Sequence, residues 1–468
     1  MATAAPARGW VAPAAAAAAA SLRGSPIRHV IEIMLENHTD DNLFPPGTPG
    51  TPGTAGGAGA AGPVHPVAAP PNEGDVQGGV VNSRPAELAA MDLRPGQGYL
   101  MDRYTDRPSG VQAITSFGPG FDPDLQYLAR TYEFAARNFQ PAIAPTGPNV
   151  AMALNGTAHR WYSNRPDPRP IPWRSIFGEL TAHGRSWKIY YALPLWMLRG
   201  TLWHQIIPPG HRAALTTASR FFTDLARGQL PGFSFVRPGI GYSEEPREDI
   251  GEGDAWLGQL VRAVARSRYW RSTAIFVTYD EGGGFWDHVA PPVAPGYGTR
   301  VPLVIVSPWA RRGVYWRRST SMSVLSFMQH LWNMPPLTPA NATQNDLAGA
   351  FDFRQRPLPA PRPPVAPADT IGFHGKTGLL EVKAPRAHHW LRINLEAETG
   401  GLTLDRGLSG PVRLTLIPPA GVTASFPATA MLAGGRASLR VRFPAAGYYR
   451  IRADGPDSSI GWTTVVVL

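Results

Sequence analysis

Two adjacent carboxylates stand at the end of an apolar segment, where a sheet would present them to a ligand. Asp280 and Glu281 follow the apolar run Ala274–Tyr279, and three glycines follow them at 282–284. Open α/β sheets bind their ligands at the carboxyl ends of the strands, so we expect a site here. Glycine lets the backbone turn sharply and approach a bound group closely. Taken alone, the motif also fits a solvated acidic pair in a hairpin turn.

A second polar group follows an apolar segment near the beginning of the chain. Glu36 and Asn37 come directly after the run 27–35. Oxygen and nitrogen donors suit a hard or borderline divalent cation, whose identity this donor set leaves open. The chain has no cysteine, which excludes disulfides, thiolate nucleophiles and zinc–thiolate sites. A polar loop is the alternative interpretation of Glu36 and Asn37.

A threonine hydroxyl is the candidate nucleophile. Thr157 follows Gly156, and His159 lies two residues further on. A threonine hydroxyl attacks poorly unless a base or a bound cation lowers its pKa. A cation held at the two strand ends would supply that activation and would take up charge on phosphate oxygens. A helix N-cap is the alternative role for Thr157.

A histidine beside a carboxylate is a candidate for phosphate binding or proton transfer. His288 follows Asp287, and a neighbouring carboxylate stabilises the protonated form of a histidine. Protonated His288 could bind a phosphate oxygen or protonate the leaving group. A buried, hydrogen-bonded structural histidine is the alternative.

The elements around these residues alternate between strand and helix. Short apolar runs typical of buried strands alternate with segments that repeat their apolar residues at helical spacing. Such alternation over some 300 residues predicts an α/β fold, with a mostly parallel sheet flanked by helices. We expect strands at 27–35, 187–191, 233–236, 274–279 and 301–306, and helices at 125–134, 175–183, 221–225, 254–265 and 323–332.

The remaining segments divide the chain further. Residues 1–26 resemble a disordered or signal-like leader, and the Gly/Pro/Ala-rich segment 45–79 is expected to be a mobile insertion in a catalytic domain at 27–345. A Pro-rich linker at 346–370 precedes residues 371–468, whose apolar residues alternate with period two. This alternation predicts a small all-β sandwich domain.

The amino-acid composition limits the kinds of partner that the protein is expected to bind. The net charge is +10, carried mostly by arginine, which fits either an ordinary solvated surface or attraction to anionic substrates and lipid head groups. No nucleic-acid motif is present, and no apolar run is long enough to predict a membrane-spanning helix. We expect a secreted or periplasmic location, with the cytoplasm as the alternative. The oligomeric state is open.

Several segments, in their order along the chain, resemble one family of phosphoesterases. It contains bacterial phospholipases C, plant non-specific phospholipases C and acid phosphatases, within the alkaline-phosphatase-like superfamily. The resemblance covers roughly residues 27–340. It is carried by HVIEIMLENHTDDNLF, PTGPNVAMALNGTAHRW, FFTDLARGQLPGFSFVRPG and TAIFVTYDEGGGFWDHVAPP, with TRVPLVIVSPWARRG after them.

The resemblance implies a metal-dependent phosphoric-ester hydrolase with a phospho-threonine intermediate. Thr157 would be the nucleophile, His159 and His288 would face the phosphate, and one divalent cation would be held by Glu36, Asn37, Asp280 and Glu281. A phosphoester would be the substrate. If this phosphoester is a phospholipid, we expect the protein to contact a membrane peripherally.

Two departures from the family pattern bear on the substrate. Where relatives usually read Asp-Glu-His-Pro, this chain has Ser243-Glu244-Glu245-Pro246, and where they often carry histidine it has Gly282. We expect Glu244, Glu245 and Asp287 to lie at the substrate. A carboxylate at 245 repels a phosphate dianion more than a diester monoanion, which favours phospholipase C-like diester cleavage. The alternatives are an acid phosphatase acting on monoesters and a catalytically silent phosphate- or lipid-binding homologue.

Overall fold

The predicted leader and the predicted insertion lie almost entirely outside the described part of the chain. Residues 364–369 of the predicted linker also lie outside it. The computed structural model describes residues 22–44, 67–68, 82–106, 110–118, 121–159, 161–164, 174–191, 206–239, 242–246, 248, 250–363, 370–375, 378–379, 386–399, 403–457 and 459–467.

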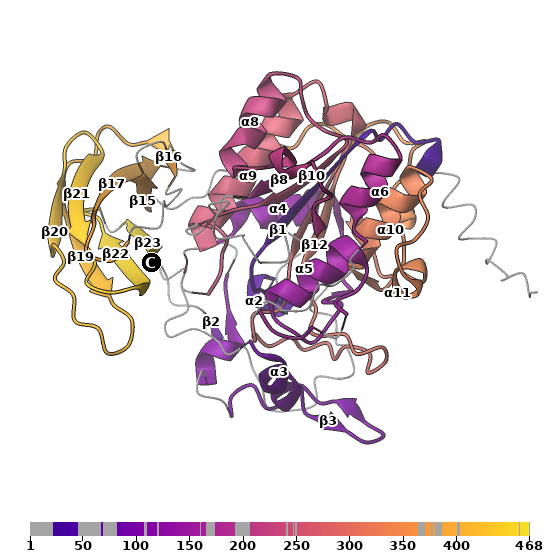
Figure 1. Cartoon of the computed structure of the whole chain (residues 1–468), viewed down its shortest axis with the longest axis horizontal. Coiled ribbons are helices and arrows are strands. Elements are labelled where there is room, and N and C mark those ends of the chain that lie inside the picture. The colour runs from indigo at the N-terminus through magenta and orange to yellow at the C-terminus, as the bar shows by residue number, and fades with distance from the viewer. Residues whose placement is uncertain are drawn as a thin grey trace, which may run out of the picture.

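An eight-stranded sheet, in the order β13-β6-β12-β11-β1-β10-β8-β9, forms the centre of the larger part of the molecule (Figure 1). The central strand β1 pairs in parallel with β10 on one side and with β11 on the other. Only β12 runs antiparallel to its neighbours β11 and β6, so the mostly parallel sheet is confirmed. The strands are β1 (His29–Leu35), β6 (Glu133–Phe134), β8 (Trp187–Tyr191), β9 (Leu215–Thr216), β10 (Phe233–Arg237), β11 (Thr273–Tyr279), β12 (Leu303–Val306) and β13 (Gly313–Val314).

Helices cover both faces of this sheet, as expected (Figure 1). Helix α9 packs against α4 and α8, while α5 packs against α6 and α10. Every residue of β11 is buried, which explains its nearly continuous apolar sequence. Among the described residues, none of the helices has both the length and the apolar composition that membrane spanning requires. These helices are α4 (Pro123–Thr131), α5 (Thr146–Asn155), α6 (Ile176–Ala182), α8 (Ala218–Ala226), α9 (Ile250–Arg266), α10 (Met322–Leu331) and α11 (Pro339–Ala342).

The helix expected at 125–134 was placed wrongly at its end. Helix α4 stops at Thr131, and Glu133 and Phe134 form β6 instead. Their backbones pair with both β12 and β13, and this tertiary pairing outweighs the local helical pattern.

Short elements follow the carboxyl edge of the sheet. Helix α2 (Asp40–Leu43) continues from β1, and α3 (Arg84–Met91) leads into a hairpin of β3 (Leu93–Arg94) and β4 (Gly98–Tyr99). Figure 1 shows α2, α3 and β3 together in the lower part of the molecule. The other short elements are β2 (Val67–Ala68), β5 (Thr115–Ser116), β7 (Asn138–Phe139) and β14 (Ser319–Thr320), with 3-10 turns at Gly110–Ile114, Arg212–Ala214, Trp270–Ser272 and Ala348–Ala350.

The C-terminal part is all-β, as predicted, and has a core of its own. Nine strands form one sheet in which all pairs are antiparallel except β15 with β23. Alternate residues of β19 and β21 point into the core, which produces the period of two in the sequence. The strands are β15 (Thr370–Gly375), β16 (Gly378–Leu379), β17 (Trp390–Thr399), β18 (Thr403–Leu404), β19 (Gly410–Ile417), β20 (Thr429–Leu432), β21 (Arg436–Arg442), β22 (Gly447–Asp454) and β23 (Ile460–Val467).

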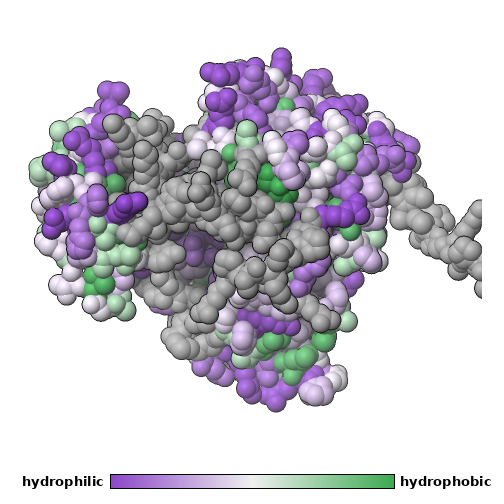
Figure 2. Space-filling model, viewed as in Figure 1, coloured by the Kyte–Doolittle hydropathy of each residue, from purple (hydrophilic) through white to green (hydrophobic). Residues whose placement is uncertain are grey.

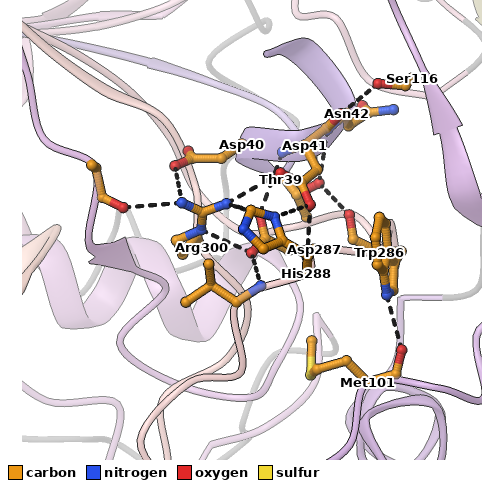
Figure 3. Close-up of polar contacts among 12 residues, drawn as sticks. Thr39, Asp40, Asp41, Asn42, Met101, Ser116, Trp286, Asp287, His288 and Arg300 are labelled. Carbon is orange, nitrogen blue, oxygen red and sulfur yellow. Dashed lines mark hydrogen bonds and ion pairs between the residues drawn. The ribbon is translucent and has the colours of Figure 1, made fainter. Parts of the chain in front are cut away.

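A buried ion-pair network ties the segment after β1 to the segment after β11 (Figure 3). Arg300 is 2% exposed and donates to both carboxylate oxygens of Asp287, at 2.8 and 3.1 Å. It also donates to Asp41 at 3.2 Å and lies 3.5 Å from Asp40. The His288 ring nitrogen Nδ1 lies 2.6 Å from Asp41. One guanidinium therefore holds three carboxylates beside the carboxyl edge of the sheet.

Replacing this guanidinium should destabilise the fold in a pH-dependent way. Burial raises the pKa of Asp287 and of Asp40, and Arg300 opposes this rise. In Arg300→Met the folded-state pKa values would rise further above the unfolded ones, so stability should fall as pH rises. We expect a loss of about 3–5 kcal/mol at about pH 8 that shrinks toward about pH 5, measured by urea unfolding. An equal loss at both pH values would contradict this role of Arg300.

Candidate active site

The segments that carry the four predicted cation ligands lie side by side at the carboxyl edge of the sheet. Strands β1 and β11 are parallel neighbours with Leu35 opposite Tyr279, so the residues that follow them emerge side by side. The Asn37 backbone N–H donates to Asp280 Oδ1 at 3.1 Å, and the Glu281 N–H donates to the same oxygen at 2.8 Å. Glu281 itself accepts from Asn82 Nδ2 at 2.9 Å.

The glycines after Glu281 allow the two strand ends to approach each other. A Cβ at Gly283, where φ is +64°, would lie 2.2 Å from the Asn37 carbonyl oxygen. A Cβ at Gly282 would lie 2.1 Å from Thr299 Oγ1. A side chain at position 282 would therefore clash with Thr299 unless that side chain moved.

Two residues that the sequence analysis did not select complete this cluster. Arg237, at the end of β10, is 1% exposed; it contacts Glu36 and lies 3.3 Å from Asp280 Oδ2. Thr146, the first residue of α5, donates from Oγ1 to Glu36 Oε2 at 3.3 Å. The Thr146 hydroxyl, the carboxylates of Glu36 and Asp280, and the Arg237 guanidinium therefore lie together at the edge of the sheet.

Thr157 and His159 lie elsewhere. Thr157 comes after the last turn of α5, and the ten residues of this helix separate it from Thr146 by about 15 Å. Its hydroxyl accepts from the backbone N–H of His159 at 3.1 Å. The preceding Gly156 packs against Thr338. The structure thus does not bring Thr157 to the carboxylates that were expected to activate it.

Charge and hydrogen bonding in the cluster fit a divalent cation. Burial raises the pKa of Asp280 and of Glu281, and for Glu281 the charge of Asp280 adds to the effect. Glu36, Asp280 and Glu281, set against Arg237, leave an excess of two negative charges when all are ionised. Asn37 has a φ of 63°, and its buried Oδ1 has no hydrogen-bond partner. Such an orphaned oxygen among buried carboxylates suits a bound cation.

The two glutamates at 244 and 245 occupy different surroundings. Glu244 is buried with a φ of 64°, and its carboxylate accepts from the hydroxyl of Tyr279 inside the protein. We expected it at the substrate, whereas the structure turns its side chain inward, toward Tyr279. Glu245 is exposed. Burial lowers the pKa of Arg237 and the charge of Glu245 opposes this lowering, so Glu245 lies near the rim of the cluster.

Asp287 and His288 belong to the Arg300 network instead of facing the cluster. Burial by itself would lower the pKa of His288, but the hydrogen bond and charge of Asp41 raise it above its ordinary value. Asp41, Asp287 and His288 offer ligand atoms within 4.8 Å of one another and could hold a metal. Arg300 already donates to both carboxylates, however, so positive charge is present there without a cation.

Thr146 and Arg237 had only weak indications of a functional role in the sequence. Thr146 lies in the same motif as Thr157, but it follows Pro145 at the beginning of the helical pattern. Helix N-termini attract anions, and this rule would have favoured Thr146. Arg237 ends a strand whose neighbours in the sheet could not be known from the sequence.

The chain is similar in sequence to several phospholipases C. It is 27% identical over 229 residues to the non-specific phospholipase C6 of Arabidopsis thaliana, covering 43% of each chain. It is 32% identical over 189 residues to the non-hemolytic phospholipase C of Burkholderia pseudomallei, covering 32% of this chain and 26% of that one. The chain thus matches less than half the length of these two relatives.

Solved structures and a family model complete the comparison. The chain is similar to a protein in the alkaline phosphatase superfamily from Vibrio parahaemolyticus, with a TM-score of 0.36 and 11% identity over 60% of this chain and 72% of that chain. It is also similar to the lipoteichoic acid synthase LtaP from Listeria monocytogenes, with a TM-score of 0.38 and 8% identity over 83% and 88%. Similarities at this level support no inference of their own.

The model of the Phosphoesterase family matches residues 27–335, more than half of the chain, and the chain therefore belongs to the Phosphoesterase family.

Proposed function

We propose that this protein is a phosphoric-ester hydrolase that cleaves phosphodiesters in the manner of a phospholipase C, with Thr146 as its nucleophile. The contact between the Thr146 hydroxyl and Glu36 carries the proposal, because a nucleophile needs an acceptor for its proton. Thr146 replaces Thr157 in this role.

The reaction has two displacements at phosphorus. Thr146 Oγ forms a bond to phosphorus while the bond to the leaving alcohol breaks; Glu36 accepts the hydroxyl proton, and the leaving oxygen takes up a proton from solvent. Water then attacks the phosphorus, which still carries its second ester group, and the bond to Thr146 Oγ breaks. Glu36 returns its proton to Thr146 Oγ, the attacking water gives up a proton to solvent, and a phosphomonoester is released. The N-terminus of the ten-residue helix α5 favours the anionic substrate beside Thr146.

Arg237 is placed to bind the phosphate group. Its buried Nη1 has no hydrogen-bond partner, while Nη2 contacts Glu36 and Asp280. A phosphate oxygen would satisfy this donor and would gain a charge-assisted hydrogen bond.

Glu36, Asn37, Asp280 and Glu281 would hold one divalent cation. When bound, it would offset the excess negative charge of the cluster and stabilise charge on a phosphate oxygen.

Diester cleavage is favoured over monoester cleavage by the exposed Glu245 near Arg237. A carboxylate at this rim repels a dianionic monoester more strongly than a monoanionic diester. An acid phosphatase is therefore the second candidate, and a phospholipid is the diester that the relatives' names suggest.

Substituting the two threonines should separate their roles. Thr146→Ala should lower kcat on a soluble phosphodiester by on the order of 10⁴-fold, while Thr157→Ala should change it by about twofold or less. Steady-state kinetics on both variants, with folding checked by circular dichroism, makes the measurement. Loss of activity in Thr157→Ala with activity kept in Thr146→Ala would reverse the assignment. If neither the native chain nor Thr146→Ala hydrolyses any diester or monoester, the result would support a catalytically silent binding protein.

Metal content should depend on the cluster at β1 and β11. Asp280→Asn removes one negative charge, so it should weaken metal binding by about 100-fold and lower activity with it. Metal stoichiometry by plasma mass spectrometry after dialysis is the readout, with Asp41→Asn as the matched control. If Asp41→Asn loses the metal and Asp280→Asn keeps it, the cation would instead lie at Asp41, Asp287 and His288.

A further inference from the structure

The exposed large apolar side chains of the main body lie on segments near one edge of the sheet. Among the described residues from 22 to 363 they are Leu93, Tyr162, Val293 and Trp316, which are 46%, 43%, 46% and 57% exposed. Scattered exposed apolar residues are normal on any protein. These four, however, lie on segments at the carboxyl edge of the sheet, where the candidate active site lies. We call them the apolar rim.

Leu93 and Val293 lie on neighbouring loops below this edge. Leu93 begins the β3–β4 hairpin, and a Cβ at Gly98 of the same hairpin would contact Val293 Cγ2 at 3.8 Å. Figure 2 shows hydrophobic residues gathered in the lower part of the view, where Figure 1 places α3 and β3.

Tyr162 lies beside the proposed nucleophile. Arg84 stacks over its ring at 4.3 Å and donates to the Ile143 carbonyl. The adjacent Trp161 packs so closely on Gly147 that a Cβ there would lie 2.5 Å from the indole ring. Since Gly147 follows Thr146 directly, this part of the rim borders the site.

Trp316 extends the rim along the sheet. It lies two residues after β13, which runs parallel to β6 and therefore in the same direction as β11. Arg318 stacks at 5.5 Å over the ring of Tyr297, which lies in the same loop as Val293. Trp316 therefore emerges at the edge that carries Asp280.

The charges around the rim are mainly positive. Trp316 is followed by the exposed Arg317 and Arg318, and Arg84 covers Tyr162. Beside Leu93, Arg94 and Arg103 share the single carboxylate of Asp92. Exposed aromatic and aliphatic side chains among arginines are typical of surfaces that contact anionic membranes.

We propose that the apolar rim docks on an anionic phospholipid bilayer and thereby holds the candidate site against the lipid head groups. The inference rests on the proposed function, since it makes a bilayer the platform for the substrate. The four side chains would enter the head-group region, and the surrounding arginines would pair with lipid phosphates.

Vesicle binding tests this surface without requiring turnover. The full chain is sedimented with vesicles of phosphatidylglycerol and phosphatidylcholine, and in parallel with vesicles of phosphatidylcholine alone. We expect binding to the anionic vesicles, weakened about tenfold in Val293→Asp/Trp316→Ala. The matched control is Trp390→Ala, since Trp390 is 61% exposed and lies under Arg440 and Arg442, but belongs to the C-terminal sheet.

Kinetics on a soluble diester separates docking from chemistry. The double variant should keep its turnover on the soluble diester and lose it on vesicles. Normal vesicle binding with no turnover of any ester would count against the proposed function and would still support docking. The proposal is overturned if the native chain stays in solution, binds neutral vesicles equally well, or loses binding through Trp390→Ala instead.

Discussion

The parallel pairing of β1 with β11 is the interaction on which the candidate site depends. It sets the end of each strand beside the other, so that Glu36 and Asn37 emerge against Asp280 and Glu281. Residues some 240 positions apart in sequence thus come within hydrogen-bond distance through backbone register alone. Any change that shifted this register by one residue would turn the carboxylates away from one another.

Burying so many carboxylates at one edge is unfavourable unless cations accompany them, and the chain supplies two arginines for this purpose. Arg300 serves the network of Asp41 and Asp287, whose negative charge it offsets through several hydrogen bonds. Arg237 only partly offsets its neighbours and keeps an unpaired donor. We therefore interpret the Arg300 network as structural. The cluster around Arg237 can bind further ligands.

The sheet could be predicted from the sequence because apolar runs indicate buried strands locally, and the acidic residues at the ends of two of these runs selected the candidate cluster. The choice between Thr146 and Thr157 needed the direction of α5 relative to the sheet, which no spacing contains. Glu244 was misplaced because its left-handed backbone turns the side chain inward to Tyr279. The guanidinium of Arg300 was missed since its partners lie far away in the sequence.

The identity of the phosphorylated residue tests the central claim most directly. The reaction with a soluble phosphodiester is quenched in acid during turnover, and the peptide that contains both threonines is sequenced by mass spectrometry. A phosphoryl group that keeps the substrate's second ester on Thr146 is the predicted result, because of the two threonine hydroxyls that of Thr146 lies against Glu36 at the joined ends of β1 and β11. The same adduct on Thr157 would contradict the account.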